Sequence, residues 1–318
     1  MQPHVRTALV VLVVSTAASP ASAQQCAGSP GVQAVCNRAI DALKMLHPAV
    51  GLIVSGGDPS LGRARALGGF GHFFITGRVN AVSVRAPSPD TALGAVPIHD
   101  FVPAPVVEAG IGIWPGFQNG VLAVDALCSA TLVPTHAIDK LRVDSSAAHF
   151  GSLALGLGYG ARVGVFSGAF PIPDVSVSVM RRSLPRLTYG RLAASSLSSG
   201  DAFDFSTDVK ATNVRVTAGY HLPVADVVAG FGFDHYTSDG LLRYYDNPPL
   251  ATVALVPFTP RNDREVIFAD AAFHVALASL GGEVGYQTGK DQHLSAIYSG
   301  FSAKSGHFFG GIGLRVGF

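Results

Sequence analysis

Hydrophobic residues alternate with small or polar residues along Gly306–Phe318. One face of an extended strand would carry Phe308, Gly310, Ile312, Leu314, Val316 and Phe318. The opposite face would carry His307, Phe309, Gly311, Gly313, Arg315 and Gly317. Because successive side chains of a strand point to opposite faces, the pattern predicts a strand with one apolar face and one face of mainly small or polar groups.

The same alternation recurs from Phe70 onward. Ten runs show it: 70–85, 101–114, 119–132, 150–167, 174–190, 202–221, 224–238, 264–277, 280–289 and 306–318. Most runs reach or exceed the roughly 9 to 11 residues that a tilted strand needs to cross a membrane. Long separators alternate with short ones such as Leu222–Pro223, as in membrane barrels with long loops outside and tight turns in the periplasm.

The predicted fold class is therefore all-β: a transmembrane, antiparallel, up-and-down barrel of about ten strands over residues 70–318. Twelve strands are the alternative, and they require Ala251–Thr259 and His293–Ser302 to be strands as well. A soluble β-sandwich would also alternate, but its exposed face should carry many Lys, Glu, Thr and Ser residues. In the run 150–167 one face carries large apolar residues and the other mainly glycine.

Composition agrees with dispersed hydrophobicity. Charged residues make up only 14% of the 318 residues and the mean hydropathy is +0.36. Nevertheless, no uninterrupted apolar run of about 18 residues, the length of a spanning helix, follows the N-terminal region. A net charge of +1 gives no electrostatic reason to expect a nucleic-acid partner.

The closing strand resembles that of bacterial outer-membrane β-barrels, whose terminal Phe is part of the signal read by the barrel-assembly machinery. The resemblance covers residues 70–318, concerns the class generally and matches no specific family. It implies an outer-membrane location, outer-membrane lipid and the assembly machinery as partners, and Phe318 as the assembly signal. We expect a monomer from a Gram-negative-type bacterium.

The N-terminus predicts export. His4 and Arg6 precede an apolar run over Ala8–Val14, and Ala21–Ala23 fits a cleavage site, so residues 1–23 form a predicted signal peptide. Residues 24–69 form a predicted helical and loop segment, with an amphipathic helix over 31–47 that Pro48 ends. This segment would plug the lumen or cap the barrel's lower rim in the periplasm.

The chain has three cysteines. Cys26 and Cys36 lie ten positions apart at the start of the mature chain, where export favours a local disulfide. Cys128 lies in a predicted strand, on the face assigned to lipid. A metal site at the first pair would need further Cys or His ligands at suitable spacing, so we predict neither a metal nor a cofactor.

Assigning the apolar face outward leaves one ionisable residue on the inward face of each strand. These residues are Arg78, Glu108, Asp125, Arg162, Arg182, Arg215, Asp234, Asp270, Glu283 and Arg315. Charge on the lipid face is costly, so this register supports the inward assignment. His274 lies on the same face as Asp270. In so narrow a barrel, the charges would form a neutralising network or line a conduit.

The leading functional prediction is a narrow, charge-lined channel or a binding protein for small solutes. The alternative is a closed barrel with a structural or surface-interaction role. A remote alternative follows from Asp234–His235, with Asp201, Asp204 and Asp208 near them, which resembles the acidic and Asp-His pairs of the ten-stranded omptin proteases. No further omptin motif surrounds them, so no catalytic residue is predicted and we do not expect an enzyme.

Overall fold

The computed structural model describes residues 26, 30–87, 97–134, 141–143, 148–150, 153–168, 171–190, 203–247, 252–298, 300 and 302–317. The predicted signal peptide, the predicted assembly signal Phe318 and Asp201 lie outside the described residues.

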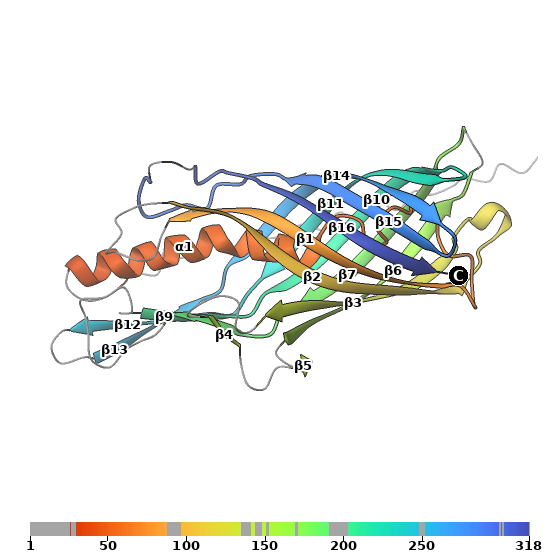
Figure 1. Ribbon diagram of the computed structural model, residues 1–318. Coiled ribbons are helices and arrows are strands. Elements are labelled where there is room, and N and C mark those ends of the chain that lie inside the picture. Colours follow the sequence, from red (N-terminus) through yellow and green to blue (C-terminus); the bar gives the residue numbers. More distant parts are fainter. Residues whose placement is uncertain are drawn as a thin grey trace, which may run out of the picture.

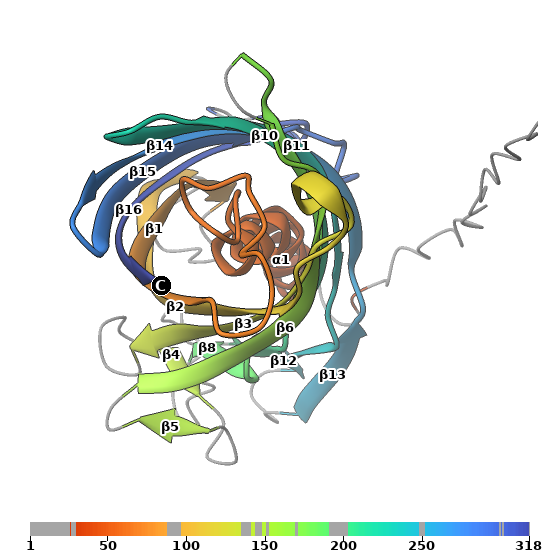
Figure 2. The same cartoon turned by 90° about the vertical axis from the view of Figure 1, so that its right-hand side faces the viewer.

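Ten long antiparallel strands close into a barrel in the described part of the chain (Figures 1 and 2). They are β1 (Phe73–Pro87), β2 (Pro97–Trp114), β3 (Val124–Pro134), β6 (Leu153–Phe166), β7 (Asp174–Ser183), β10 (Lys210–His221), β11 (Ala225–Thr237), β14 (Arg261–Val275), β15 (Ala278–Gln287) and β16 (His307–Gly317). Pairing of β1 with β16 and of β3 with β6 completes the circuit. The predicted ten-stranded barrel is confirmed.

Two short elements lie outside the ten strands. The two-residue β5 (His149–Phe150) pairs with β6, and the 3-10 helix η1 (Gln118–Gly120) lies between β2 and β3 in the sequence.

A second sheet extends the barrel at the end with the long loops (Figure 1). Its strands are β13 (Thr252–Phe258), β12 (Gly240–Asn247), β9 (Phe203–Thr207), β8 (Leu187–Gly190) and β4 (Leu141–Val143), in that order. The alternative count of twelve barrel strands is wrong: β13 belongs to this second sheet, and the described residues of 293–302 contain no strand.

Two predicted runs are each divided between the barrel and the second sheet. The run 174–190 is broken between Ser183 and Leu187, around Pro185, which lacks the N–H that a ladder needs. The run 202–221 is broken at Asp208 and Val209. At the break, the amide of Leu184 donates to the carbonyl of Val209, so the two interruptions lie side by side.

The two faces of the wall differ as the alternation predicts. Among the described residues, large apolar side chains remain exposed on the outside of nine of the ten barrel strands, β3 being the exception. Examples are Val79, Leu157, Phe231, Ile267, Val284 and Ile312. An exposed apolar belt of this extent marks a surface that meets lipid. No helix in the described part of the chain is long and apolar enough to cross a membrane.

Helix α1 (Pro30–Ser55) lies partly inside the barrel (Figure 2), and its first turns lie beside the second sheet (Figure 1). The prediction that Pro48 ends this helix is wrong, because α1 continues for two further turns past the buried Pro48. A proline inside a helix removes one backbone hydrogen bond. Burial of Ala49, Leu52 and Ile53 against the wall offsets that loss.

Candidate functional site

Residues 56–69 continue from α1 through the lumen to β1 (Figure 2), and we call them the lumen segment. Of the two predicted locations, the contacts with the wall place the segment in the lumen. Gly56 ends α1 with a positive φ of 59°, and its amide donates to the carbonyl of Leu52 at 2.9 Å. Glycine adopts this left-handed conformation without strain, which explains a helix end here. Strand β1 begins after a further turn.

The structure places all ten predicted wall charges on the inward face of their strands. None of these residues is more than 6% exposed. We call them the lumen charges: Arg78, Glu108, Asp125, Arg162, Arg182, Arg215, Asp234, Asp270, Glu283 and Arg315. His274 also points inward but lies at the end with the tight turns, away from the centre of the group.

Glu108 is shared between two arginines in the middle of the barrel. Its Oε1 lies 3.1 Å from Nη2 of Arg78 and 3.0 Å from Nη2 of Arg182. Arg78 also lies 3.7 Å from Oε1 of Glu283 through its other terminal nitrogen. These contacts link side chains from β2, β1, β7 and β15, so the network crosses the lumen and joins strands that are not neighbours in the sheet.

Two further pairs connect adjacent strands. Arg162 donates through Nε to Oδ2 of Asp125 at 2.9 Å, and Arg215 donates through Nη1 to Oδ1 of Asp234 at 2.5 Å. Asp234 also accepts from Tyr236. Because an unpaired buried charge is costly, these pairs neutralise groups that water does not reach.

The arginines also hold the backbone that fills the lumen. Each of the five donates to a carbonyl oxygen of the chain between Ser55 and Arg63. The bonds are Arg182 to Ser55 at 2.9 Å, Arg215 to Gly56 at 2.7 Å and to Gly57 at 3.1 Å, Arg78 to Asp58 at 3.0 Å, Arg315 to Ser60 at 2.8 Å and Arg162 to Arg63 at 3.1 Å. All five predicted basic lumen charges thus share one role.

Three of the acidic lumen charges accept the amides of the same segment. Glu283 accepts from Gly57 at 3.1 Å and from Asp58 at 2.6 Å. Asp270 accepts from Gly62 at 2.7 Å, and both oxygens of Asp125 accept from Leu67 at 3.1 Å. The lumen segment has little regular structure of its own, and buried peptide groups need partners. The wall supplies them.

Close approach explains a glycine at position 57. A Cβ on Gly57 would collide with the Glu283 carboxylate. The same holds for Gly51 in α1, where an added Cβ would lie 2.5 Å from the ring of Tyr236. The segment is therefore fitted to the wall and leaves no room for small side-chain additions at these points.

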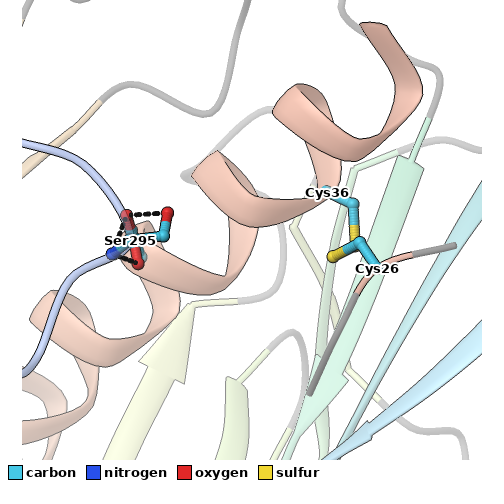
Figure 3. The surroundings of a disulfide bond; sticks show 4 residues. Cys26, Cys36 and Ser295 are labelled. Carbon is cyan, nitrogen blue, oxygen red and sulfur yellow. Dashed lines mark hydrogen bonds between the residues drawn. A yellow bond between two sulfur atoms is a disulfide. The ribbon is translucent and has the colours of Figure 1, made fainter. Parts of the chain in front are cut away.

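The outer half of α1 packs on the second sheet. Cys26 forms a disulfide with Cys36 (Figure 3), and both cysteines are buried with Ile40, Phe205 and Tyr244 in one apolar cluster. The first turns of the helix are thus fixed to the sheet rather than to the barrel wall. Cys128 is a free cysteine exposed on the outer face, where the sequence placed it.

A second contact, which we call the loop clip, joins α1 to the loop between β15 and β16. Asp41 accepts the amide of Ser295 at 2.9 Å, its hydroxyl at 2.7 Å and the hydroxyl of Tyr298 at 2.9 Å (Figure 3 shows the Ser295 bonds). Lys44 donates to the carbonyl of His293 at 2.8 Å. Burial and the Asp41 hydrogen bond raise the pKa of Tyr298 above its usual range.

The residues behind the protease alternative are not brought together. Asp234 is buried in the lumen, whereas His235 points outward and lies 2.6 Å from Asp263 on β14. Asp204 forms an ion pair with Arg243, and Asp208 pairs with Lys210 at 3.1 Å. Asp234 and His235 therefore face opposite sides of the wall and cannot act on one bond as a pair.

No residue pattern indicated that the lumen charges bind peptide groups, because any residue type can supply a backbone N–H or C=O. Ser55, Ser60 and Asn213 were missed as well: Asn213 donates to Ser55 at 2.8 Å and Arg162 donates to Ser60 at 2.6 Å. The one available signal was the glycine-rich stretch 51–69, whose peptide groups had no predicted ladder or helix to satisfy them.

The sequence matches no model of a known protein family and no curated protein. Solved bacterial outer-membrane β-barrels resemble the structure. Outer membrane protease OmpT from Escherichia coli shares 11% identity over 78% of this chain and 97% of its own, with a TM-score of 0.41. The translocator domain of autotransporter NalP from Neisseria meningitidis shares 11% identity over 78% of this chain and 88% of its own, also with a TM-score of 0.41. Neisserial surface protein A shares 10% identity over 77% and 97%, with a TM-score of 0.28. Similarity at this level of identity concerns the fold alone.

Proposed function

We propose that this chain is a closed outer-membrane barrel that holds its N-terminal helix at the outer surface for interaction, rather than an open channel. The observation that carries the proposal is the set of hydrogen bonds from all five lumen arginines to carbonyl oxygens of the chain inside the lumen. These bonds hold the lumen segment in place along much of the barrel.

Energetics favours the closed state. Withdrawing the lumen segment would remove peptide partners from Arg78, Arg215 and Glu283 together. A buried polar group left without its hydrogen-bond partner costs about 1–3 kcal/mol, so the resting protein should not open spontaneously. A solute would have to displace many such contacts at once.

The outer end supports an interaction role. By the usual asymmetry of loop length, the end with the second sheet faces outward. There the apolar cluster around the disulfide packs α1 on the second sheet, and the loop clip joins α1 to Ser295 and Tyr298. Leu255 and Ile297 remain exposed at this end. A rigid outer platform with exposed apolar groups suits contact with another surface.

Solute passage, the leading prediction from the sequence, stays a prediction and would need a mobile lumen segment. Conductance of the refolded protein in planar bilayers distinguishes the two functions. We expect no discrete channels from the native protein, and channels from a variant lacking residues 30–69, provided that heat-modifiable gel mobility shows a folded barrel. Ion-selective channels from the native protein, with selectivity altered in Arg182→Ala, would instead establish the conduit.

A further inference from the structure

Three metal-ligating side chains meet at the rim with the tight turns, apart from the lumen charges. His221 ends β10, Asp226 is the second residue of β11 and His274 is the last residue but one of β14. These strands are neighbours, with β11 in the middle, and His221 is the register partner of Asp226. The ligand atoms of the three residues all lie within 4.8 Å of one another.

The carboxylate of Asp226 is the centre of the group. It is only 3% exposed, and its Oδ1 lies 2.5 Å from Nδ1 of His221. Its Oδ2 lies 3.2 Å from Nε2 of His274, and this buried nitrogen has no hydrogen-bond partner. The two imidazole rings are 5.5 Å apart between centroids. Both rings thus direct a nitrogen toward one carboxylate.

We propose that His221, Asp226 and His274 bind a divalent transition metal, with Zn²⁺ as the best match. Two imidazole nitrogens and one carboxylate oxygen form a ligand set that zinc accepts, with a fourth position open to water. A cavity of about 10 Å³ lined by His221 and Asp226 adjoins the site. That volume matches the space that one water molecule needs.

The lumen segment reaches the same place. Arg63 and Arg65 line the cavity, and Arg65 lies 3.8 Å from Asp174. Their positive charge opposes a bound cation and so limits its affinity. The side chain of Arg65 is partly exposed and pairs with Asp174 at the rim, so the barrel should still fold when it is replaced. Arg65→Gln removes one positive charge beside the site and should therefore bind Zn²⁺ more tightly than the native chain. The metal would join three strands beside residues 63–65 of the lumen segment.

Zinc titration of the full-length, tag-free protein, folded in detergent, tests the site. Isothermal calorimetry with ZnCl2 should show one saturable site per chain. Removing a group that only orients a metal ligand lowers metal affinity by about 10- to 100-fold. Removing a ligand itself, in His221→Gln, Asp226→Asn or His274→Gln, should therefore lower Zn²⁺ affinity by at least about tenfold. Co²⁺ in place of Zn²⁺ should give visible absorption that these variants lose.

His235→Gln is the matched control, because His235 also pairs with an aspartate at the wall surface but has no second histidine beside it. It should bind Zn²⁺ like the native protein. Absence of saturable binding, or unchanged affinity in Asp226→Asn, would overturn the site. Heat-modifiable mobility verifies folding, and His221→Gln, with a half-exposed side chain, decides the question if Asp226→Asn does not fold.

Discussion

At the scale of single residues, Glu283 links the wall to the chain inside it. Its carboxylate accepts two amides of the lumen segment and lies beside Arg78. Neither contact can be replaced by water when the side chain is removed, because the site is closed. The same reasoning applies to the five arginines, each of which holds a carbonyl group of the chain inside the lumen.

Replacing Glu283 by alanine should destabilise the folded barrel by about 3–5 kcal/mol, since it removes one of the two carboxylates beside Arg78 and leaves the amides of Gly57 and Asp58 without a partner. The measurement is the urea midpoint of heat-modifiable mobility in detergent. Glu265→Ala, on the outward face of β14, is the control and should unfold like the native protein. Equal midpoints for both variants would contradict the role given to Glu283.

A methyl group at position 51 tests the fit of α1. Gly51→Ala should cost about 1–3 kcal/mol by forcing the helix away from Tyr236. Gly77→Ala adds the same methyl group on β1, where nothing lies within 4 Å, and it should have little effect. Thermal midpoints of the two variants make the comparison. A native-like midpoint for Gly51→Ala would mean that α1 is not held tightly against the wall.

At the scale of elements, α1 has two environments. Its inner half packs on the barrel wall through Leu52 and Ile53, and its outer half packs on the second sheet beside the disulfide. Only the outer half depends on the disulfide and the loop clip. The two halves should therefore respond separately to changes at either end.

Loss of the disulfide should loosen the outer half alone. In Cys36→Ser, we expect faster proteolysis around Arg38 and Lys44, because a cross-link over a short loop contributes about 2–4 kcal/mol. Heat-modifiable mobility should be unchanged, since the apolar cluster around the cysteines is formed by α1 and strands of the second sheet. Cys128→Ser, on the outer face, is the control. Proteolysis at the same rate as in the control would show that sheet packing alone holds the helix.

The loop clip should weaken at high pH. The pKa of Tyr298 is raised in the folded protein from an ordinary value of 10.0, so the folded state favours the protonated phenol. Its stabilisation is complete below pH 10.0 and is lost as the pH rises beyond it. Proteolysis of the loop 288–306 should accelerate above that pH in the native protein. Tyr298→Phe should show a smaller change across the same range; an identical pH dependence would remove Tyr298 as the cause.

At the scale of the whole molecule, the sidedness of the barrel can be measured. The test uses a Cys128→Ser background that retains the Cys26–Cys36 disulfide, so that an introduced cysteine is the one free thiol. In this background, Ile297→Cys should react with a membrane-impermeant maleimide on intact cells. Leu277→Cys, exposed at the opposite end, should react only after permeabilisation. The reverse pattern would place the second sheet in the periplasm and remove the proposed interaction surface.

Alternation along the chain was sufficient to predict the ten barrel strands and the inward register of every lumen charge. The reason is that the outer face of the wall meets lipid, where a charged side chain is costly, so charged residues occupy the inner face. The length of α1 was not predictable from local rules: Pro48 reads as a stop, and only the packing of Leu52 and Ile53 inside the barrel carries the helix past it. The second sheet was not predictable from the alternation, because β8 continues the pattern of β7, and β9 that of β10, with only a short interruption.

The group of His221, Asp226 and His274 was also invisible in the sequence. No short spacing joins His274 to the other two residues, and only the pairing of β11 with both of its neighbours brings them together. The Asp-His pair on which the omptin resemblance rested is separated for a related reason. Adjacent positions in a strand face opposite ways, so Asp234 and His235 are close in the sequence yet separated by the wall.

Pairing of β1 with β16 closes the barrel around α1 and the lumen segment. We therefore expect these two events, closure of the barrel and entry of the N-terminal stretch, to be ordered during folding in the membrane. In a barrel without the N-terminal stretch, the five arginines would lack the carbonyl groups that they hold in the folded protein, so we expect that stretch to be seated before or while the last strand pair forms.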